Sequence, residues 1–371
     1  MVSLVIGILI HFILETILEP SKVNVFKLRE DKKIKKIHLL LVFLVFASVI
    51  ICLSLSSCSD QKKTIVLSMV NFVSDVPPGA NWPRLFMSNV ERMSNGTMKI
   101  RFLGPESIPS SDAPAAVKRG TVDIASALAA FCDAIVPGSS SIGRAEYSPM
   151  ELRNGPAFKY YQEQFASQGI YYLGASVASL PQVQAVFYLR KDIKTLKDFE
   201  GLKIASMGGS NRMFIEKLKA VCVPIDFPDY FTSMERGTVD GYIIGIPGIQ
   251  DFSLTPVTKV MLDEPVGSCA GMIIMNMNKY KSLTPEQQDI LNRAMIQAEI
   301  DGATLFTEVV DMVKKDISAA GVKIIRLSPS DSKQFYLDYR NTMWEEDMQR
   351  WPDIVPKLKE WLVNPAFSRA K

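Results

Sequence analysis

Apolar and polar positions follow strand-like and helix-like periods in alternation from residue 64 onward. Thr64 to Val70 is a short apolar run typical of a strand, and Asn81 to Ser94 places its large apolar side chains at helical spacing. Met98 to Leu103 is strand-like, Ala113 to Lys118 is helix-like, and Ile124 to Ala130 is strand-like again. Strand, helix, strand, helix and strand in this order predict a mostly parallel sheet with helices on both faces.

The rest of the chain continues this alternation up to its last helices. Thr284 as an N-cap residue and Pro285 at the first helical position begin a helical stretch that runs to about residue 320. That stretch is long enough to bridge two lobes. We also predict strands at 170–177, 184–189, 203–206, 224–227, 260–262, 271–277 and 322–327, and helices at 154–168, 194–202, 211–221, 330–344 and 355–362.

The pentapeptide Arg-Gly-Thr-Val-Asp occurs twice, at 119–123 and at 236–240. Each copy follows a helix-like stretch and precedes a strand-like one, and its glycine suits a helix C-terminus, where a positive φ favours a residue without Cβ. Either the chain uses one helix–turn–strand unit in two similar α/β lobes, or a common turn has recurred by chance. Two lobes would form a cleft between them, and such clefts bind small ligands.

The first part of the chain has the order of an export signal. A basic cluster at 27–36 is followed by an uncharged apolar run at 39–57 and then by Cys58. The phrase Leu55-Ser56-Ser57-Cys58 resembles the lipobox of bacterial lipoproteins, in which the signal is cut before the cysteine and the thiol carries a diacylglyceryl group. The alternative is an uncleaved transmembrane anchor, since about 20 apolar residues span a bilayer. We expect 1–57 to be a leader and 58–63 a lipidated tether that holds the chain at a membrane, in the periplasm.

Residues 1 to about 26 are unusual in front of such a signal. The segment from Met1 to Leu18 is apolar but contains acidic residues, and no methionine lies between Met1 and Met69. One interpretation is an additional membrane helix. The other, which we favour, is that translation begins on a non-AUG codon near Val23, Val25 or Leu28.

Composition narrows the chemistry of the chain beyond the leader. Residues 58–371 carry 35 basic and 35 acidic side chains, because the leader holds 7 of the 42 Lys and Arg and 4 of the 39 Asp and Glu. This formal neutrality gives no basic surface for nucleic acid. Both histidines, His11 and His38, lie in the leader, which removes Ser–His and Cys–His nucleophile pairs and histidine metal ligands. We therefore expect no catalytic residues, no metal and no cofactor.

The cysteines beyond Cys58 do not change this interpretation. Cys132, Cys222 and Cys269 are odd in number, widely spaced and set among apolar residues. They are predicted to be small buried side chains rather than a disulfide framework or a metal site.

Several local phrases, in order, resemble one known family. They are 89–96 (NVERMSNG), 116–123 (AVKRGTVD), 192–204 (DIKTLKDFEGLKI), 233–241 (SMERGTVDG) and 280–291 (YKSLTPEQQDIL). These phrases are similar to those of the DctP-type solute receptors of tripartite ATP-independent periplasmic (TRAP) transporters. The resemblance covers nearly all of Thr64 to Leu362.

The resemblance implies a fold, a role and partners. The fold is α/β, two-lobed and type II-like, with two mostly parallel sheets and a long helix of about 284–320 bridging the lobes. We expect 64–185 to be mainly lobe 1, 186–262 mainly lobe 2, and 263–371 to return to both. The family captures a small organic ligand by hinge closure and delivers it to a membrane permease, and an accessory helical-repeat lipoprotein is a further candidate partner. The alternative in another class is a ligand sensor for a signalling protein.

Two positions depart from the family pattern and bear on the ligand. Most members place an arginine after "GlKi", where it pairs with a ligand carboxylate, and many carry an asparagine in "DGqeNP". Here these positions are Ala205 and Ile244. A buried carboxylate without a cation is costly, so we expect a mostly apolar ligand such as a monocarboxylate. The alternative is a dicarboxylate or sugar acid held by a displaced arginine, above all Arg212.

Other candidate ligand-binding residues are aromatic. Phe72 follows the first strand at its C-terminal end, where open α/β sheets bind ligands. Tyr242 replaces a polar family position, and Phe131, Tyr147 and Phe231 lie near the expected cleft. Arg144, Arg153 and Glu146 occupy an irregular segment that could face the cleft, but as single charged residues they are expected at the surface.

Overall fold

The first of two sheets combines strands from the start of the chain with one from much later. The computed structural model describes residues 64–72, 75, 81–176, 185–207, 211–267 and 270–365. The leader, Cys58, the tether and Cys269 lie outside these residues. The sheet has the strand order β2-β1-β3-β10-β4. Its strands are β1 (Ile65–Asn71), β2 (Met98–Leu103), β3 (Ile124–Leu128), β4 (Ile170–Ser176) and β10 (Gly271–Asn276).

The second sheet contains six strands in the order β11-β9-β5-β8-β6-β7. They are β5 (Ala185–Leu189), β6 (Lys203–Ser206), β7 (Val221–Pro224), β8 (Gly241–Gly245), β9 (Val260–Leu262) and β11 (Lys323–Ile325). β6 is parallel to both β7 and β8, whereas β5 is antiparallel to β8 and β9. The strand expected at 224–227 begins earlier, at Val221, and pairs with β6 through Pro224.

Both sheets are mixed, because the chain crosses between the lobes. β10 runs antiparallel to β3 and β4, and β5 runs antiparallel to its neighbours. Each of these strands follows a segment of the other sheet, so it enters its own sheet at the edge where the parallel strands end. The expected two-lobed α/β fold is confirmed, with more antiparallel pairing than the sequence indicated.

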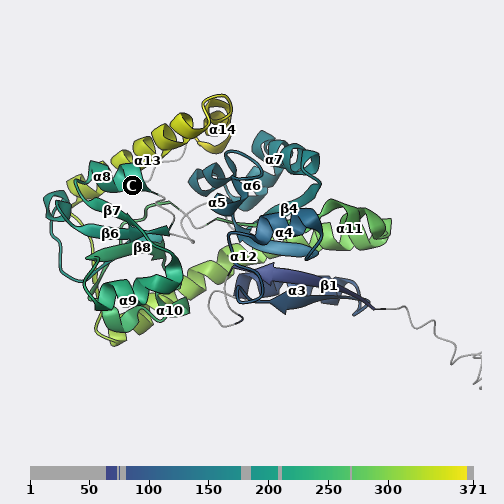
Figure 1. Cartoon of the computed structure of the whole chain (residues 1–371), viewed down its shortest axis with the longest axis horizontal. Coiled ribbons are helices and arrows are strands. Elements are labelled where there is room, and N and C mark those ends of the chain that lie inside the picture. Colours follow the sequence, from purple (N-terminus) through teal and green to yellow (C-terminus); the bar gives the residue numbers. More distant parts are fainter. Residues whose placement is uncertain are drawn as a thin grey trace, which may run out of the picture. The chain divides into compact units, whose positions relative to one another are not determined.

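Helices cover the faces of the two sheets (Figure 1). The first lobe has α3 (Asn81–Met93), α4 (Ala113–Arg119), α5 (Ala129–Cys132), the 3-10 helix η1 (Ser139–Arg144), α6 (Pro149–Asn154), α7 (Pro156–Ser167) and α11 (Met277–Ser282). The second has η2 (Leu196–Phe199), α8 (Arg212–Lys217), η4 (Phe227–Asp229), α9 (Tyr230–Glu235), α10 (Gly248–Asp251) and η5 (Thr255–Val257). α13 (Pro329–Arg350) and α14 (Val355–Leu362) follow β11.

The long helix α12 (Pro285–Ala319) serves both lobes. Thr284 begins it with a capping box, in which its hydroxyl accepts from the Gln287 N–H and the Gln287 side chain accepts from the Thr284 N–H. Leu291 and Met295 in its first half pack with the core of the first sheet, and Val313 in its second half packs with that of the second. One helix thus buries apolar surface against both sheets, and Figure 1 shows it passing from one to the other.

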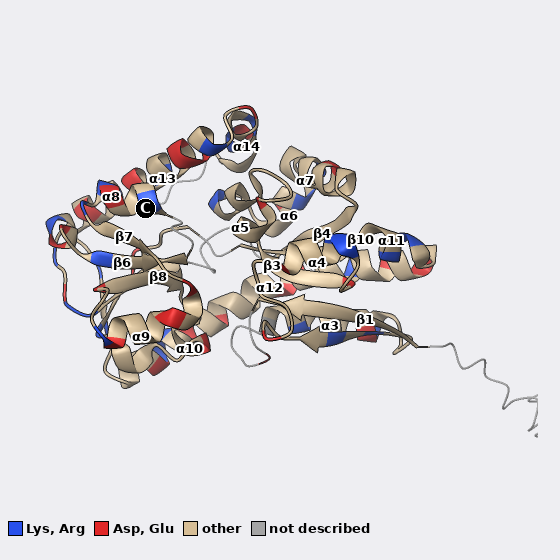
Figure 2. Cartoon of the chain, viewed as in Figure 1, with Lys and Arg blue, Asp and Glu red and all other residues tan. Residues whose placement is uncertain are grey.

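Charge is distributed over the helices rather than the sheets. Figure 2 shows both signs of charge along α13, whereas the strands are mainly uncharged. Within the part of the chain that the structure describes, no helix is both long and apolar enough to cross a membrane.

The two copies of Arg-Gly-Thr-Val-Asp perform the same structural task. Gly120 and Gly237 follow α4 and α9 with φ of 76° and 71°. Asp123 accepts from the backbone N–H of Ser68 at 2.8 Å, and Asp240 accepts from that of Lys203 at 2.9 Å. In each lobe the aspartate thereby ties the strand that follows it to its parallel neighbour. The prediction of one helix–turn–strand unit used twice is confirmed.

Replacing Gly120 with alanine should destabilise the protein by about 1 kcal/mol, because a residue with Cβ is strained at this positive φ. A Cβ at this position would meet nothing closer than the Asn276 amide nitrogen at 3.5 Å, so the cost is backbone strain rather than overlap. Urea denaturation measures it. Gly120→Asn is the control, since asparagine tolerates the left-handed region and should cost less. Equal stability of all three proteins would contradict the argument.

Candidate functional site

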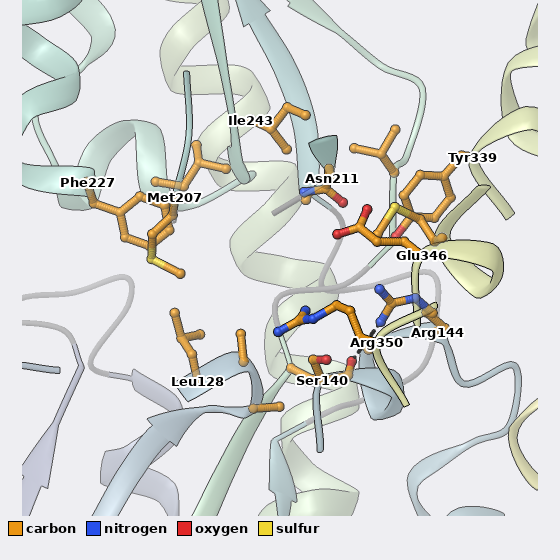
Figure 3. Close-up of a pocket in the computed structure, with 18 residues that line it drawn as sticks. Leu128, Ser140, Arg144, Met207, Asn211, Phe227, Ile243, Tyr339, Glu346 and Arg350 are labelled. Atoms are coloured by element: carbon orange, nitrogen blue, oxygen red, sulfur yellow. Dashed lines mark hydrogen bonds between the residues drawn. The ribbon is translucent and has the colours of Figure 1, made fainter. Parts of the chain in front are cut away.

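A cavity of about 140 Å³ lies where strands of both sheets end. Its apolar wall consists of Leu128, Met207, Phe227, Ile243, Ile244 and Val266, and its polar wall includes Ser140, Arg144, Asn211, Tyr339, Glu346 and Arg350. We call it the interlobe cavity. Figure 3 shows Phe227, Met207 and Leu128 on one side of it and Glu346, Arg144 and Arg350 on the other.

The apolar wall follows from the topology. Leu128 ends β3, Ile244 lies near the end of β8, Met207 follows β6, and Phe227 follows β7 soon after that strand ends. These four strands present their carboxyl ends to the cavity, which is where open α/β sheets bind ligands. β3, β6 and β8 are largely buried, so apolar side chains lie at or next to their ends, whereas β7 is partly exposed at the edge of its sheet.

One face of α13 contributes much of the polar wall. Tyr339, Met343, Glu346 and Arg350 recur at spacings of four, three and four residues and therefore share a face. The helix was expected to end at residue 344, but it continues to Arg350. Pro352 is the signal that could have placed this end, since the residue before a proline disfavours helix. The extra turn and a half carries Glu346 and Arg350, two of the three charged residues that line the cavity.

Arg144, at the end of η1, is held in a fixed position. Its Nη2 lies 3.0 Å from Oδ1 of the fully buried Asp347, and its Nη1 donates to the Ser140 carbonyl at 3.0 Å. Burial opposes the charged form of Arg144, but Asp347, Tyr339, Glu346 and Asp133 together outweigh it, and the pKa of the guanidinium is raised. Only 12% of the side chain is exposed, so the expected surface location was wrong.

Arg350 is the more open of the two cations. Its side chain is 51% exposed, and its guanidinium carbon lies 4.1 Å from the centre of the Trp351 ring. Its Nη2 is 3.8 Å from Oδ2 of Asp133, a loose ion pair. Burial raises the pKa of Asp133 to about 6, against the hydrogen bond from the Ser140 N–H. The ion pair of Arg350 with Asp133 is thus longer, at 3.8 Å, than that of Arg144 with Asp347, at 3.0 Å.

Glu346 supplies a carboxylate to the same wall. Figure 3 shows it directed toward the middle of the cavity, next to Asn211. Burial raises its pKa, while the charge of Arg144 and a hydrogen bond from the Met213 N–H oppose the change. Glu346 Oε2 and Arg144 Nε are buried and have no hydrogen-bond partner among the described residues. The Ser140 hydroxyl oxygen in the same wall is also buried and unpaired within the described part of the chain. Buried polar atoms are nearly always paired, so these atoms are candidates for contacts with a ligand.

Of the candidate ligand-binding residues, Ile244 lies at the interlobe cavity. Ala205 and Tyr242 do not line it: they are register partners in β6 and β8 and are fully buried on the sheet face covered by α9 and α12. The Tyr242 hydroxyl lies 2.7 Å from the Thr258 hydroxyl, and its ring stacks on Tyr188. Side chains alternate between the faces of a strand, so Ile243, rather than Tyr242, faces the cavity.

The remaining candidates also lie away from the cavity lining. Phe72 donates its N–H to Ser126, and the Tyr147 hydroxyl donates to the Val363 carbonyl. Phe131 and Phe231 are half-buried, with Phe231 packed on the core of the second lobe. Arg212 is exposed at the start of α8, and its neighbour Asn211 lines the cavity instead.

Two further charged residues were expected at the surface and are buried in pairs. Arg153 bonds both carboxylate oxygens of Glu299, with Nη2 donating to Oε1 at 2.8 Å. Glu146 is 6% exposed and accepts from Arg340 and from the backbone N–H of Asn364. In each pair the two residues are far apart in the sequence, so the sequence alone does not reveal the ion pair.

The groups that line the interlobe cavity are suited to binding a small ligand. Among the described residues, no cluster of three or more His, Cys, Asp or Glu could hold a metal ion. Cys132 is buried, and burial raises the pKa of its thiol well above the usual range. The polar wall offers guanidinium, carboxylate, amide and hydroxyl groups to a ligand, opposite an apolar wall.

Comparison with known proteins gives the family. Residues 74–346 match the family described as bacterial extracellular solute-binding protein, family 7 (DctP). A TRAP periplasmic solute-binding protein from Desulfovibrio salexigens with bound orotic acid has a TM-score of 0.71 and 18% identity, over 80% of this chain and 97% of that one. An extracytoplasmic solute receptor from Bordetella pertussis that binds pyroglutamic acid has a TM-score of 0.70 and 16% identity, over 80% of this chain and 99% of that one.

A third similar structure is a TRAP periplasmic solute-binding protein from a Sulfitobacter species with bound β-D-galacturonate, at a TM-score of 0.69 and 20% identity, over 80% of this chain and 99% of that one. At identities of 20% or less, the similarity of these structures shows a shared fold and no more. The family match covers most of the chain, and the resemblance drawn from the sequence is confirmed: the chain belongs to bacterial extracellular solute-binding protein family 7, the DctP family.

Proposed function

We propose that this receptor captures a small organic acid with a mostly apolar body in the interlobe cavity. The observation that carries the proposal is the pairing of an apolar wall with two arginines, Arg144 and Arg350. The apolar residues would enclose the body of the ligand, and a guanidinium would bind its carboxylate in a planar, bidentate contact.

The position of the cations supports a monocarboxylate. In the family pattern a strand supplies the arginine, and here that position is Ala205. Arg144 and Arg350 approach instead from η1 and α13. The ligands bound in the three similar structures, orotic acid, pyroglutamic acid and galacturonate, are all acids. A monoacid with an apolar body therefore agrees with both walls of the cavity.

The mechanism proposed is capture and delivery. Both lobes contribute to the wall of the cavity, so a hinge movement that brings them together would enclose the ligand and exclude water. Exclusion of water strengthens the contact between carboxylate and guanidinium. We propose that the receptor lies outside the cytoplasm, tethered to a membrane by a lipid on Cys58. In its closed form it would deliver the ligand to a TRAP permease.

Arg350→Ala should weaken the binding of a small apolar acid by about 10- to 100-fold, because a charge-assisted hydrogen bond contributes about 1.5–3 kcal/mol. Isothermal titration calorimetry with isocaproate and phenylpropionate measures the effect, with succinate as a dicarboxylate comparison. Arg212→Ala is the matched control, since it removes the same charge from an exposed site outside the cavity lining. Equal affinities of the two variants would contradict the proposal.

Binding of isocaproate or phenylpropionate should strengthen about fivefold as the pH falls from 7.5 to 5.5. The pKa of Asp133 is about 6, so its carboxylate loses its charge over this range and releases Arg350 to the ligand. A charge interaction of this size amounts to about 1 kcal/mol. Arg144 and Asp347 also interact with Asp133. Glu346 interacts with Arg350, so protonation of Glu346 would act in the same direction.

Asp133→Asn tests the origin of this pH dependence. Calorimetry at both pH values should show a flatter profile for the variant, and tighter binding than wild type at pH 7.5. A wild-type profile retained in Asp133→Asn would assign the effect to another group.

A further inference from the structure

We propose that Glu346 recognises a hydrogen-bond donor on the ligand, so that the captured acid carries an ammonium or hydroxyl group close to its carboxylate. This deepens the proposed function and rests on it. Glu346 is then a specificity-determining residue: it favours acids that carry such a group (substituted acids) over acids that lack it (plain acids).

The first observation is the unsatisfied oxygen of Glu346. Oε2 is buried at the cavity and has no hydrogen-bond partner among the described residues. The N–H of Met213 donates to the carboxylate from α8 and so restrains it. No ion pair joins Glu346 to Arg144 or Arg350 within the part of the chain that the structure describes. A restrained acceptor that faces a cavity without a partner fits a donor brought by the ligand.

The second observation is the charge of the polar wall. Arg144 is already paired with Asp347, and Arg350 lies near Asp133. With Glu346, three carboxylates therefore accompany two guanidiniums. A dicarboxylate would add two negative charges to this group and leave Oε2 facing an acceptor, which is unfavourable. An acid with one carboxylate and one donor adds a single negative charge, or none if the donor is an ammonium.

The third observation is the spacing along α13. Glu346 and Arg350 are four residues apart and lie on one face of the helix, both lining the cavity. Residues at this spacing have Cβ atoms about 5–6 Å apart. A compact ligand with its donor a few bonds from its carboxylate can therefore contact both side chains. A 2-amino or 2-hydroxy acid has this arrangement.

The experiment compares two matched sets of acids on the full-length protein by calorimetry. Isocaproate, 2-hydroxyisocaproate and leucine form one set, and phenylpropionate, phenyllactate and phenylalanine form the other. In at least one set we expect a substituted acid to bind at least tenfold more tightly than the plain acid. A site built around an acceptor rejects an analogue that lacks the donor, because the acceptor is then buried unpaired.

Variants of Glu346 assign this preference. Glu346→Leu should abolish the preference and leave the affinity for the plain acid equal or higher, an effect that a merely structural role would not produce. Glu346→Gln should retain a preference for the hydroxy acid but lose that for the amino acid, which distinguishes the two donors. Glu345→Gln, at an exposed neighbouring position, is the matched control and should change nothing.

The outcomes separate the two proposals. Plain acids that bind wild type as tightly as substituted ones, or a preference that survives Glu346→Leu, would overturn the role of Glu346 and leave acid capture intact. Binding of none of the six acids would overturn the proposed function together with this inference. Both readouts are affinity ratios, so partial loss of folded protein in one variant does not mimic them.

Discussion

The buried carboxylate of Asp347 is the interaction on which the cavity depends. An ionised side chain with no exposed surface is tolerated only where other groups replace the water it has lost. Arg144 pairs with one oxygen at 3.0 Å and the Ser141 hydroxyl donates to the other at 2.7 Å, both from η1. Because Asp347 belongs to α13, these contacts hold the last turns of that helix against the first lobe.

This anchoring explains why the polar wall is formed by α13. With Asp347 turned toward η1, Glu346 and Arg350 are left on the face that lines the cavity. The strand edges supply apolar residues, including Ile244 at a position where the family often has asparagine. The charged side chains at the cavity therefore come from η1 and α13 rather than from the strands, and α13 is itself fixed by a buried ion pair.

A second buried pair fixes the bridging helix. Arg153 bonds Glu299 of α12 and also the Leu173 carbonyl, while the Ala175 N–H donates to the same carboxylate. Burial raises the pKa of Glu299 to about 7, against the hydrogen bond from Arg153. β4 is the strand from which the chain leaves the first lobe, so this contact holds α12 to that lobe close to the crossing. The two buried pairs thus restrain α13 and α12, the helices that connect the lobes.

The sequence by itself determined the local units and the family. Periodicity placed most helices and strands, the repeated pentapeptide revealed two equivalent turns, and the capping residues located the start of α12. Tertiary structure decided which side chains meet. Whether Tyr242 or Ile243 faces the cavity depends on which face of β8 is covered, and whether Arg144 is exposed depends on a carboxylate about 200 residues away. Local propensity is encoded within a few residues, whereas a buried charge is stable only when the fold brings it a distant partner.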